Sequence, residues 1–102
     1  MYTIYRYPLE LGENSFITYH HCRVLSIGLD PRGQLSAWVL VDTSQDKTYE
    51  LKLHVVGTGW DLHKDDIVKW NYIGTTRQDE YMWHVFREIE NKECIFDESE
   101  DN

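Results

Sequence analysis

The sequence predicts an all-β protein: a small, mostly antiparallel sandwich or partly open barrel of about seven strands. Two observations support this prediction. Apolar and polar residues alternate with the period of a β-strand along most of the chain, and short turn-like stretches separate these segments. About seven strands joined by short turns in a chain of this length are typical of small sandwiches and barrels.

The first two expected strands are short. Residues 2–8, YTIYRYP, end at Pro8, whose missing N–H places the strand at a sheet edge or at a stop. Residues 15–21, SFITYHH, follow the turn LGEN and are predicted to form the second strand.

Residues 22–42 give the strongest hairpin signal. In the connecting DPRG, Asp30, Pro31 and Gly33 suit positions i, i+1 and i+3 of a type I turn. The stretch that follows, QLSAWVLVD, is apolar on both faces. We therefore expect a central strand there, buried on both sides.

Three later segments complete the strand prediction. TYELKLHVV at residues 48–56 alternates strictly, and VKWNYIG at 68–74 and YMWHVFREI at 81–89 follow the same period. The polar TTRQDE between the last two is predicted as a hairpin loop. One helical turn is expected near residues 61–66 with Asp61 as N-cap, and the next strand should begin near Ile67.

The charge separates a nearly neutral body from an acidic tail. Of the net charge of -8, residues 88–102 carry -6, with one lysine against seven acidic residues. We therefore expect one β domain over residues 1–89 and a mobile acidic tail over residues 90–102. A body without clustered lysine and arginine argues against direct binding to nucleic acid or to an anionic membrane, and it leaves a basic protein partner open.

Cysteine usage and the N-terminus predict a compartment. Cys22 and Cys94 do not form a disulfide framework or a zinc knuckle, which favours a reducing cytoplasm. The N-terminal MYTIYRYPLEL has no signal pattern, and no apolar run approaches the roughly 18 residues of a membrane span. We expect a soluble protein that stays in a reducing cytoplasm.

Residues 54–66, HVVGTGWDLHKDD, suggest a phosphate loop at first sight. The GTG lacks the third glycine of a dinucleotide fingerprint and the lysine of a P-loop, and Asp61 would repel phosphate. We predict a backbone turn in which Gly57 and Gly59 supply a positive φ or allow a close backbone approach.

Neither a metal site nor a catalytic site is predicted, and no cofactor is expected. His20 and His21 are adjacent and would point to opposite faces of a strand, while His20 and Cys22 make only two ligands. No G-x-S-x-G elbow is present, and Cys22 has no identifiable orienting group. The chain is therefore predicted not to be an enzyme.

The many tyrosine and tryptophan residues predict a recognition surface instead. These residue types anchor interfaces, although packing on two-faced strands would also use several of them. Six residues are predicted to bind a partner: Tyr19, His21, Trp60, His63, Trp70 and Arg77.

Five short blocks, YRYPLEL, AWVLVD, VVGTG, YIGT and WHVF, follow one another within residues 2–86. Together they resemble a small family of phage-encoded proteins that is catalogued as a domain of unknown function. Its members usually carry His-Pro after the GTG, where this chain has Trp60 and Asp61, and the acidic tail is an addition. The resemblance implies a phage origin and a β fold, but no reaction.

These observations lead to one main hypothesis and two alternatives. The main one is a non-enzymatic phage accessory protein that binds and modulates a host protein of defence or nucleic-acid metabolism, with a homodimer as an option. One alternative is a homo-oligomeric sponge for a small nucleotide signal, in which Arg77, the histidines and stacking aromatics form a site between subunits. The other is a minor virion component.

Overall fold

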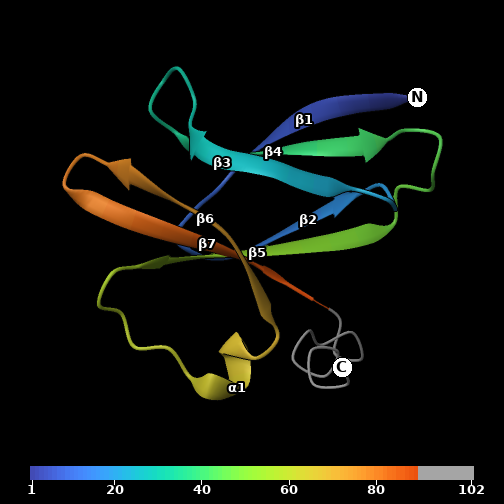
Figure 1. The fold of residues 1–102 in the computed structure, drawn as a ribbon. Helices are drawn as coiled ribbons and strands as arrows, with labels where there is room; N and C mark the ends of the chain where they lie inside the picture. Colours follow the sequence, from blue (N-terminus) through green and yellow to red (C-terminus); the bar gives the residue numbers. More distant parts are fainter. Residues whose placement is uncertain (90–102) are drawn as a thin grey trace, which may run out of the picture.

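Two antiparallel β-sheets make up the protein, with one short helix between two strands of the second sheet (Figure 1). The computed structural model describes residues 1–89, so the mobile acidic tail expected for residues 90–102 lies outside the described residues. The sheets contain three and four strands and do not close into a barrel. The prediction of a small all-β fold is confirmed.

The three-stranded sheet has the order β1–β4–β3. The central strand β4 (Leu35–Asp42) pairs with β1 (Tyr2–Pro8) on one side and with β3 (Arg23–Leu29) on the other. The central position predicted for β4 is confirmed, as is the edge position of β1, which ends at Pro8.

The turn between β3 and β4 has the predicted chemistry. The Gly33 N–H donates to the Asp30 carbonyl at 2.8 Å, which closes the turn from position i to i+3. Gly33 has a φ of +85°, where a residue with a Cβ would be strained. The Asp30 carboxylate accepts hydrogen bonds from the Arg32 and Gln34 N–H groups, both at 2.8 Å, and fixes the loop.

The four-stranded sheet has the order β2–β5–β7–β6. Its strands are β2 (Gly12–Thr18), β5 (Tyr49–Gly57), β7 (Tyr81–Glu88) and β6 (Trp70–Gln78). The helix α1 (Lys64–Ile67) is a single turn on the connection from β5 to β6. Side chains of β5 and β7 alternate between the two faces as the sequence predicts, because adjacent residues of a strand point in opposite directions.

The helical turn differs from its prediction at both ends. Its N-cap is His63, whose Nδ1 accepts the Asp65 N–H at 3.2 Å, and not Asp61. Ile67 belongs to the helix, so the expectation of a strand near this residue was wrong and β6 begins at Trp70. The His63 imidazole accepts the N–H hydrogen bond that an Asp or Ser side chain usually accepts at an N-cap. The sequence pattern does not indicate this substitution.

The predicted hairpin loop at residues 75–80 was too long. Strand β6 continues to Gln78 and β7 starts at Tyr81, so only Asp79 and Glu80 form the loop. Asp79 adopts a φ of +56°, which aspartate tolerates better than most residues. Thr75 and Thr76 are β-branched, and their preference for strands outweighs the polar character that suggested a loop.

The hydrophobic core lies between the two sheets. The inner face of β4 is completely buried, whereas Trp38 and Leu40 on its outer face are only half-buried. Burial of β4 is therefore complete on one side alone, because no second layer covers the outer face within residues 1–89. The core residues are Leu9, Leu35, Ala37, Val39, Val41, Leu51, Leu53, Val55, Trp83 and Val85.

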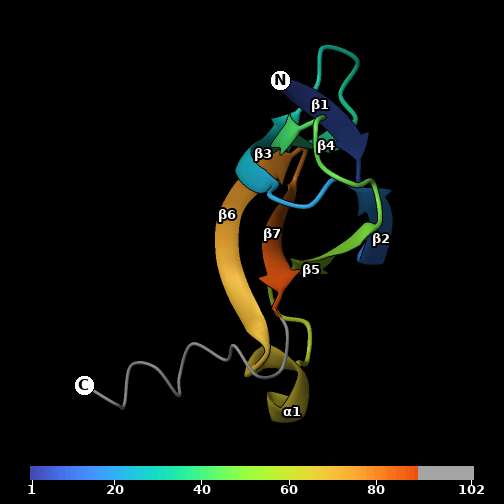
Figure 2. The same cartoon turned by 90° about the vertical axis from the view of Figure 1, so that its right-hand side faces the viewer.

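Two connections hold the sheets against each other. Strand β6 curves from α1 towards β3 (Figure 2), and Ile27 of β3 packs against the backbone of Gly74. At the other side, the buried Leu9 links β1 to β2 and its N–H donates to the Leu35 carbonyl at 2.8 Å. The three-stranded sheet thus covers one face of the four-stranded sheet and leaves its outer face open.

Candidate functional site

The outer face of the four-stranded sheet carries a row of aromatic and histidine side chains. We call this row the aromatic face; it consists of Trp70 and Tyr72 from β6 and His84 and Phe86 from β7. The centroid of the Phe86 ring lies 5.4 Å from that of Trp70 and 5.6 Å from that of Tyr72. Tyr72 remains 59% exposed, so the row is not simply internal packing.

One end of the aromatic face is fixed by a histidine. His54 of β5 is 8% exposed and stacks on Trp70, with 4.3 Å between ring centroids and 19° between planes. Its Nε2 lies 2.8 Å from Oε1 of Glu88. Stacking and this polar contact hold Trp70 in one orientation.

A chain of hydrogen bonds leads from the aromatic face to the loop after β5. The Tyr72 hydroxyl lies 2.5 Å from Oγ1 of Thr75, which lies 2.9 Å from Nδ1 of His84. The other imidazole nitrogen, Nε2, lies 2.7 Å from Oγ1 of Thr58. His84 therefore joins β6, β7 and the loop that follows β5.

Beyond Thr58 lies a cavity of about 470 Å³, which we call the aromatic pocket. It forms because the ladder between β5 and β7 ends at Gly57 and Trp83, while β7 extends two residues further, to Tyr81. The chain turns away there, with Trp60 N–H donating to the Gly57 carbonyl at 3.2 Å. The lining residues are Gly57, Thr58, Trp60, Glu80, Tyr81, Met82 and Trp83.

Three aromatic rings shape the pocket. The buried Trp83 ring lies 5.5 Å from Tyr81 at 16° between planes and 6.0 Å from Trp60 at 71°. The Trp83 indole N–H donates to Oε1 of Gln78 at 2.9 Å, so this ring is fixed. Trp60 is 46% exposed and Tyr81 is 61% exposed. Two accessible rings thus each pack on the fixed Trp83 ring and are steeply inclined to one another.

The two glycines of the GTG segment place Trp60. A Cβ on Gly57 would lie 2.8 Å from Nε1 of Trp60 and 3.0 Å from the Trp83 ring, so this position must lack a side chain. Gly59 has a φ of +90°, and a Cβ there would meet nothing within 4 Å, so this glycine is needed for the backbone conformation of the turn and not for space.

Three of the six predicted partner-binding residues belong to the aromatic pocket or the aromatic face, or lie beside them. Trp60 lines the aromatic pocket and Trp70 belongs to the aromatic face. Arg77 lies opposite Met82 in the β6–β7 ladder, beside both regions. Thr58 and Met82 line the pocket and Thr58 contacts His84, so the pocket adjoins the aromatic face at the edge of the sheet, while Tyr81 and Trp83 lie on the opposite face of β7 from His84.

The other three predicted residues lie elsewhere. His63 is exposed and caps α1. Tyr19 and His21 belong to the connection between β2 and β3, where Tyr19 packs against Tyr5 at 6.3 Å and His21 has a φ of +62°. Residue type alone placed them in the prediction, and the fold does not bring them to the aromatic pocket.

Sequence reasoning missed several residues of this surface: Tyr72, Tyr81, Met82, His84 and Phe86. Alternation along β7 did place Met82, His84 and Phe86 on one side. No sequence signal shows that this side faces outward, because that depends on which face the other sheet covers.

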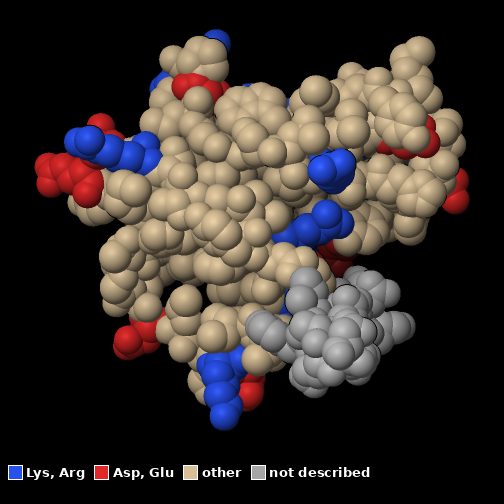
Figure 3. Space-filling model, in the orientation of Figure 1, with Lys and Arg blue, Asp and Glu red and all other residues tan. Residues whose placement is uncertain are grey.

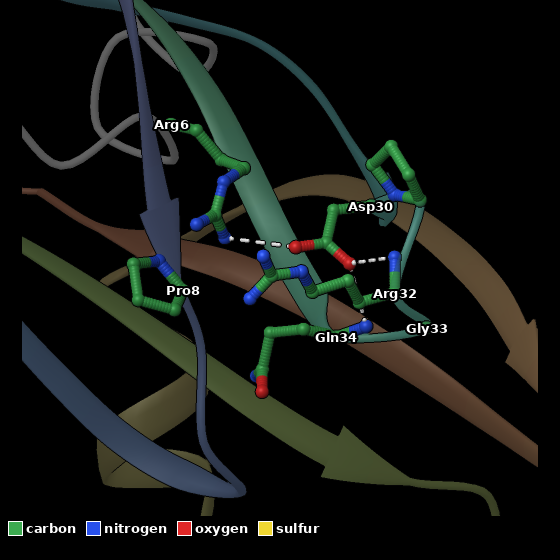
Figure 4. Close-up of a pocket in the computed structure, with 7 residues that line it drawn as sticks. Arg6, Pro8, Asp30, Arg32, Gly33 and Gln34 are labelled. Atoms are coloured by element: carbon green, nitrogen blue, oxygen red, sulfur yellow. Dashed lines mark hydrogen bonds and ion pairs between the residues drawn. The ribbon is translucent and has the colours of Figure 1, made fainter.

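A second and larger hollow, of about 660 Å³, adjoins the β3–β4 turn (Figure 4). Here Nη1 of Arg6 lies 3.2 Å from the Asp30 carboxylate, so the cation is already paired. Hydrogen bonds from the Gln34 and Arg32 N–H groups hold the pKa of Asp30 below its usual value. The ion pair links β1 to the turn. This structural role accounts for both charged residues without a ligand.

Other kinds of site find little support within residues 1–89. No group of three His, Cys, Asp or Glu side chains there is placed to hold a metal ion. Burial raises the pKa of the Cys22 thiol, which disfavours the thiolate needed for nucleophilic attack. No helix in this part of the chain is long and apolar enough to cross a membrane.

The fold is an all-β domain of two open antiparallel sheets, with an aromatic face on the outer side of one sheet and an aromatic pocket at its edge. The chain belongs to the family described as Domain of unknown function (DUF7352), which it matches over residues 1–94. No curated protein and no solved structure matches it. The expected kinship to a family of unknown function is confirmed, while the phage origin stays a prediction.

Proposed function

We propose that this protein is a non-enzymatic phage accessory protein that binds and modulates a host protein, one of defence or nucleic-acid metabolism, in the host cytoplasm. The observation that supports it is that two groups of accessible aromatic rings, the aromatic face and the aromatic pocket, adjoin at the contact between Thr58 and His84. Tryptophan and tyrosine at such positions are the usual anchors of protein interfaces.

The geometry of the surface favours binding. Its exposed rings are held in place before any partner arrives: Trp70 by His54, Tyr72 by Thr75, and Tyr81 by Trp83. Side chains that are already ordered lose little conformational entropy on association. Such preorganisation suits a binding surface better than scattered, mobile aromatic residues would.

The polar groups on this surface support binding over catalysis. His84 is engaged at both ring nitrogens by Thr75 and Thr58, and no carboxylate within residues 1–89 orients it as a general base. The His54 and Glu88 pair is a charge-capable contact, but His54 is buried under Trp70. Both nitrogens of His84 and the Nε2 of His54 are thus already engaged by neighbouring side chains.

The nucleotide alternative has less support at the GTG segment. A phosphate cradle needs several free backbone N–H groups pointing at the ligand. Here the Trp60 N–H is used by the Gly57 carbonyl, and Gly57 itself is buried beneath the Trp60 indole.

The virion alternative predicts co-purification with particles, which a gradient of purified phage would show.

Affinity capture with matched variants tests the proposal. The bait protein should retain a stoichiometric host protein from a bacterial lysate at low salt, and Trp60→Ala combined with Tyr72→Ala should lose it. Tyr2→Ala is the control, because Tyr2 is 67% exposed on β1 of the other sheet. The proposal fails if no stoichiometric protein is retained, or if both variants retain it equally.

A further inference from the structure

We propose that the aromatic pocket binds an arginine side chain of the protein partner. This inference rests on the proposed function and specifies the partner's chemistry: a basic segment whose guanidinium enters between Trp60 and Tyr81. Three independent features support it, namely the arrangement of the rings, the charges at the pocket rim and the size of the cavity.

The rings offer electron-rich faces from two directions. The Tyr81 plane is nearly parallel to that of Trp83, whereas the Trp60 plane is steeply inclined to it. A cation placed over the face of a tryptophan or tyrosine is attracted by the ring quadrupole. The guanidinium group is planar and weakly hydrated, so it stacks on such faces more readily than an ammonium.

The rim of the pocket is acidic. Glu80 lines the cavity, Asp79 precedes it in the hairpin loop, and Asp61 directly follows Trp60. Figure 3 shows acidic atoms next to a basic group at the β6–β7 hairpin tip, and acidic atoms over the β5–α1 loop; these two segments border the pocket. Arg77 is the neighbouring cation, and its Nε already donates to the Asp79 carbonyl at 2.7 Å. A cationic guest is therefore complementary in charge.

The cavity suits a side chain of this shape. Its volume of about 470 Å³ exceeds that of one arginine side chain and leaves room for partner backbone at the mouth. Thr58 and Met82 provide methyl and thioether surface on which the apolar stem of an arginine can pack. An apolar anchor would use these contacts but gain nothing from Glu80.

A pair of near-isosteric probes tests the charge requirement. Nα-acetyl-arginine methylamide and its neutral citrulline counterpart are titrated into the 15N-labelled full chain while the indole N–H signals of the tryptophans are followed. We expect the arginine probe to shift the Trp60 signal and to bind at least about tenfold more tightly than citrulline. Equal affinity for the two probes, or no Trp60 shift with either, would overturn the inference.

Two substitutions assign the effect to the pocket. Trp60→Leu keeps an apolar side chain but removes the ring, so it should abolish the preference for arginine. Glu80→Gln lies in an exposed hairpin loop and should weaken arginine binding a few-fold at low salt, with citrulline binding unchanged. Tyr2→Leu is the matched control and should change neither; unaltered arginine binding in Trp60→Leu contradicts the inference.

Failure of this inference is distinguishable from failure of the proposed function. In one outcome, partner capture depends on Trp60 and Tyr72 while the pocket does not discriminate between arginine and citrulline. That result would support the proposed function and contradict the proposal that the pocket binds arginine. Arginine selectivity without any stoichiometric partner would reject the host-protein proposal, and with it the assignment of the guest to that partner.

Discussion

Gly57 shows how one missing side chain shapes the candidate site. The last residue of β5 is buried, and the Trp60 indole rests on it where a Cβ would otherwise lie. The requirement is steric and comes from close approach, because Gly57 does not have a positive φ. The orientation of Trp60 therefore depends directly on this position.

Gly57→Ala should destabilise the protein and displace Trp60. The added methyl group would lie 3.0 Å or less from both indoles, and overpacking of this kind costs about 1–3 kcal/mol of unfolding free energy. Urea unfolding measures the loss, and the Trp60 indole N–H signal reports the displacement. Gly28→Ala is the matched control, since a Cβ there meets only Trp38, at 3.9 Å. Equal effects at the two glycines would refute the steric explanation.

Asp42 links the stability of the three-stranded sheet to pH. Hydrogen bonds from the Ser44 hydroxyl at 2.6 Å and the Ser44 N–H at 3.0 Å lower the pKa of Asp42 to about 2. Because this pKa is depressed on folding, the carboxylate stabilises the folded state above its usual pKa of 3.8. That contribution is lost as the pH falls from about 4 to about 2.

Asp42→Asn should therefore lower the unfolding free energy at pH 7 and leave it almost unchanged near pH 2. Chemical unfolding at pH 7, 4 and 2.5 measures the difference between variant and parent, which should shrink along this series. Asp46→Asn in the same loop is the control, because the Asp46 side chain is exposed and makes no hydrogen bond within residues 1–89. A difference that is constant with pH would exclude the proposed linkage.

At the level of elements, strands β5, β7 and β6 of the four-stranded sheet are joined by side chains and not only by their ladders. Glu88 of β7 contacts His54 of β5 at 2.8 Å and Lys52 at 3.8 Å, and His54 in turn stacks on Trp70 of β6. The half-buried carboxylate thus supports one end of the aromatic face.

Glu88→Ala should cost about 1–2 kcal/mol of unfolding free energy, because the nearly buried His54 imidazole loses a polar partner. The measurement is again urea unfolding, with the indole N–H NMR signal of Trp70 as a local reporter. Glu13→Ala is the matched control: Glu13 faces His54 across the β2–β5 ladder but forms no ion pair within the described residues. Comparable losses in the two variants would show that general surface charge, and not this contact, is responsible.

The sequence predicts where the strands lie along the chain better than it predicts which strands pair with each other. Alternation identifies seven strands, and Asp30 with Gly33 identifies one turn, because both signals are local. The contact between Thr58 and His84 joins residues 26 positions apart, and it depends on the pairing of β5 with β7. Periodicity contains no information about that pairing, so the aromatic pocket could not be predicted.

At the scale of the whole molecule, the open arrangement of the two sheets decides what is available for binding. The inner faces of both sheets are buried in the core, so only the outer faces and the ends of loops are accessible to a partner. Trp60 and Trp70, predicted from residue type alone, lie on such a surface, whereas Tyr19 is occupied by packing against Tyr5. Exposure is a property of the assembled fold, which explains why residue type was right for some positions and uninformative for others.

The acidic C-terminal sequence gives the last prediction, which concerns association rate. Residues 90–102 carry one lysine against six acidic residues, and residue 89 leaves β7 beside Lys69, whose carbonyl accepts the Ile89 N–H at 2.8 Å. Removing residues 90–102 should leave the unfolding free energy unchanged. It should slow association with a basic partner by roughly tenfold at low ionic strength, because long-range attraction steers encounter.

A full-length variant in which amides replace the six acidic residues separates charge from chain length. We expect it to associate as slowly as the truncated protein, and stopped-flow or surface-plasmon measurements between about 0.02 and 0.5 M salt would show it. The advantage of the parent should vanish at the high end, where the screening length falls to about 4 Å. If the amide variant associates as fast as the parent at low salt, electrostatic steering by this segment is ruled out. Dissociation rates should stay equal in all three proteins, because the aromatic pocket and the aromatic face, which hold the partner in this proposal, are intact in each.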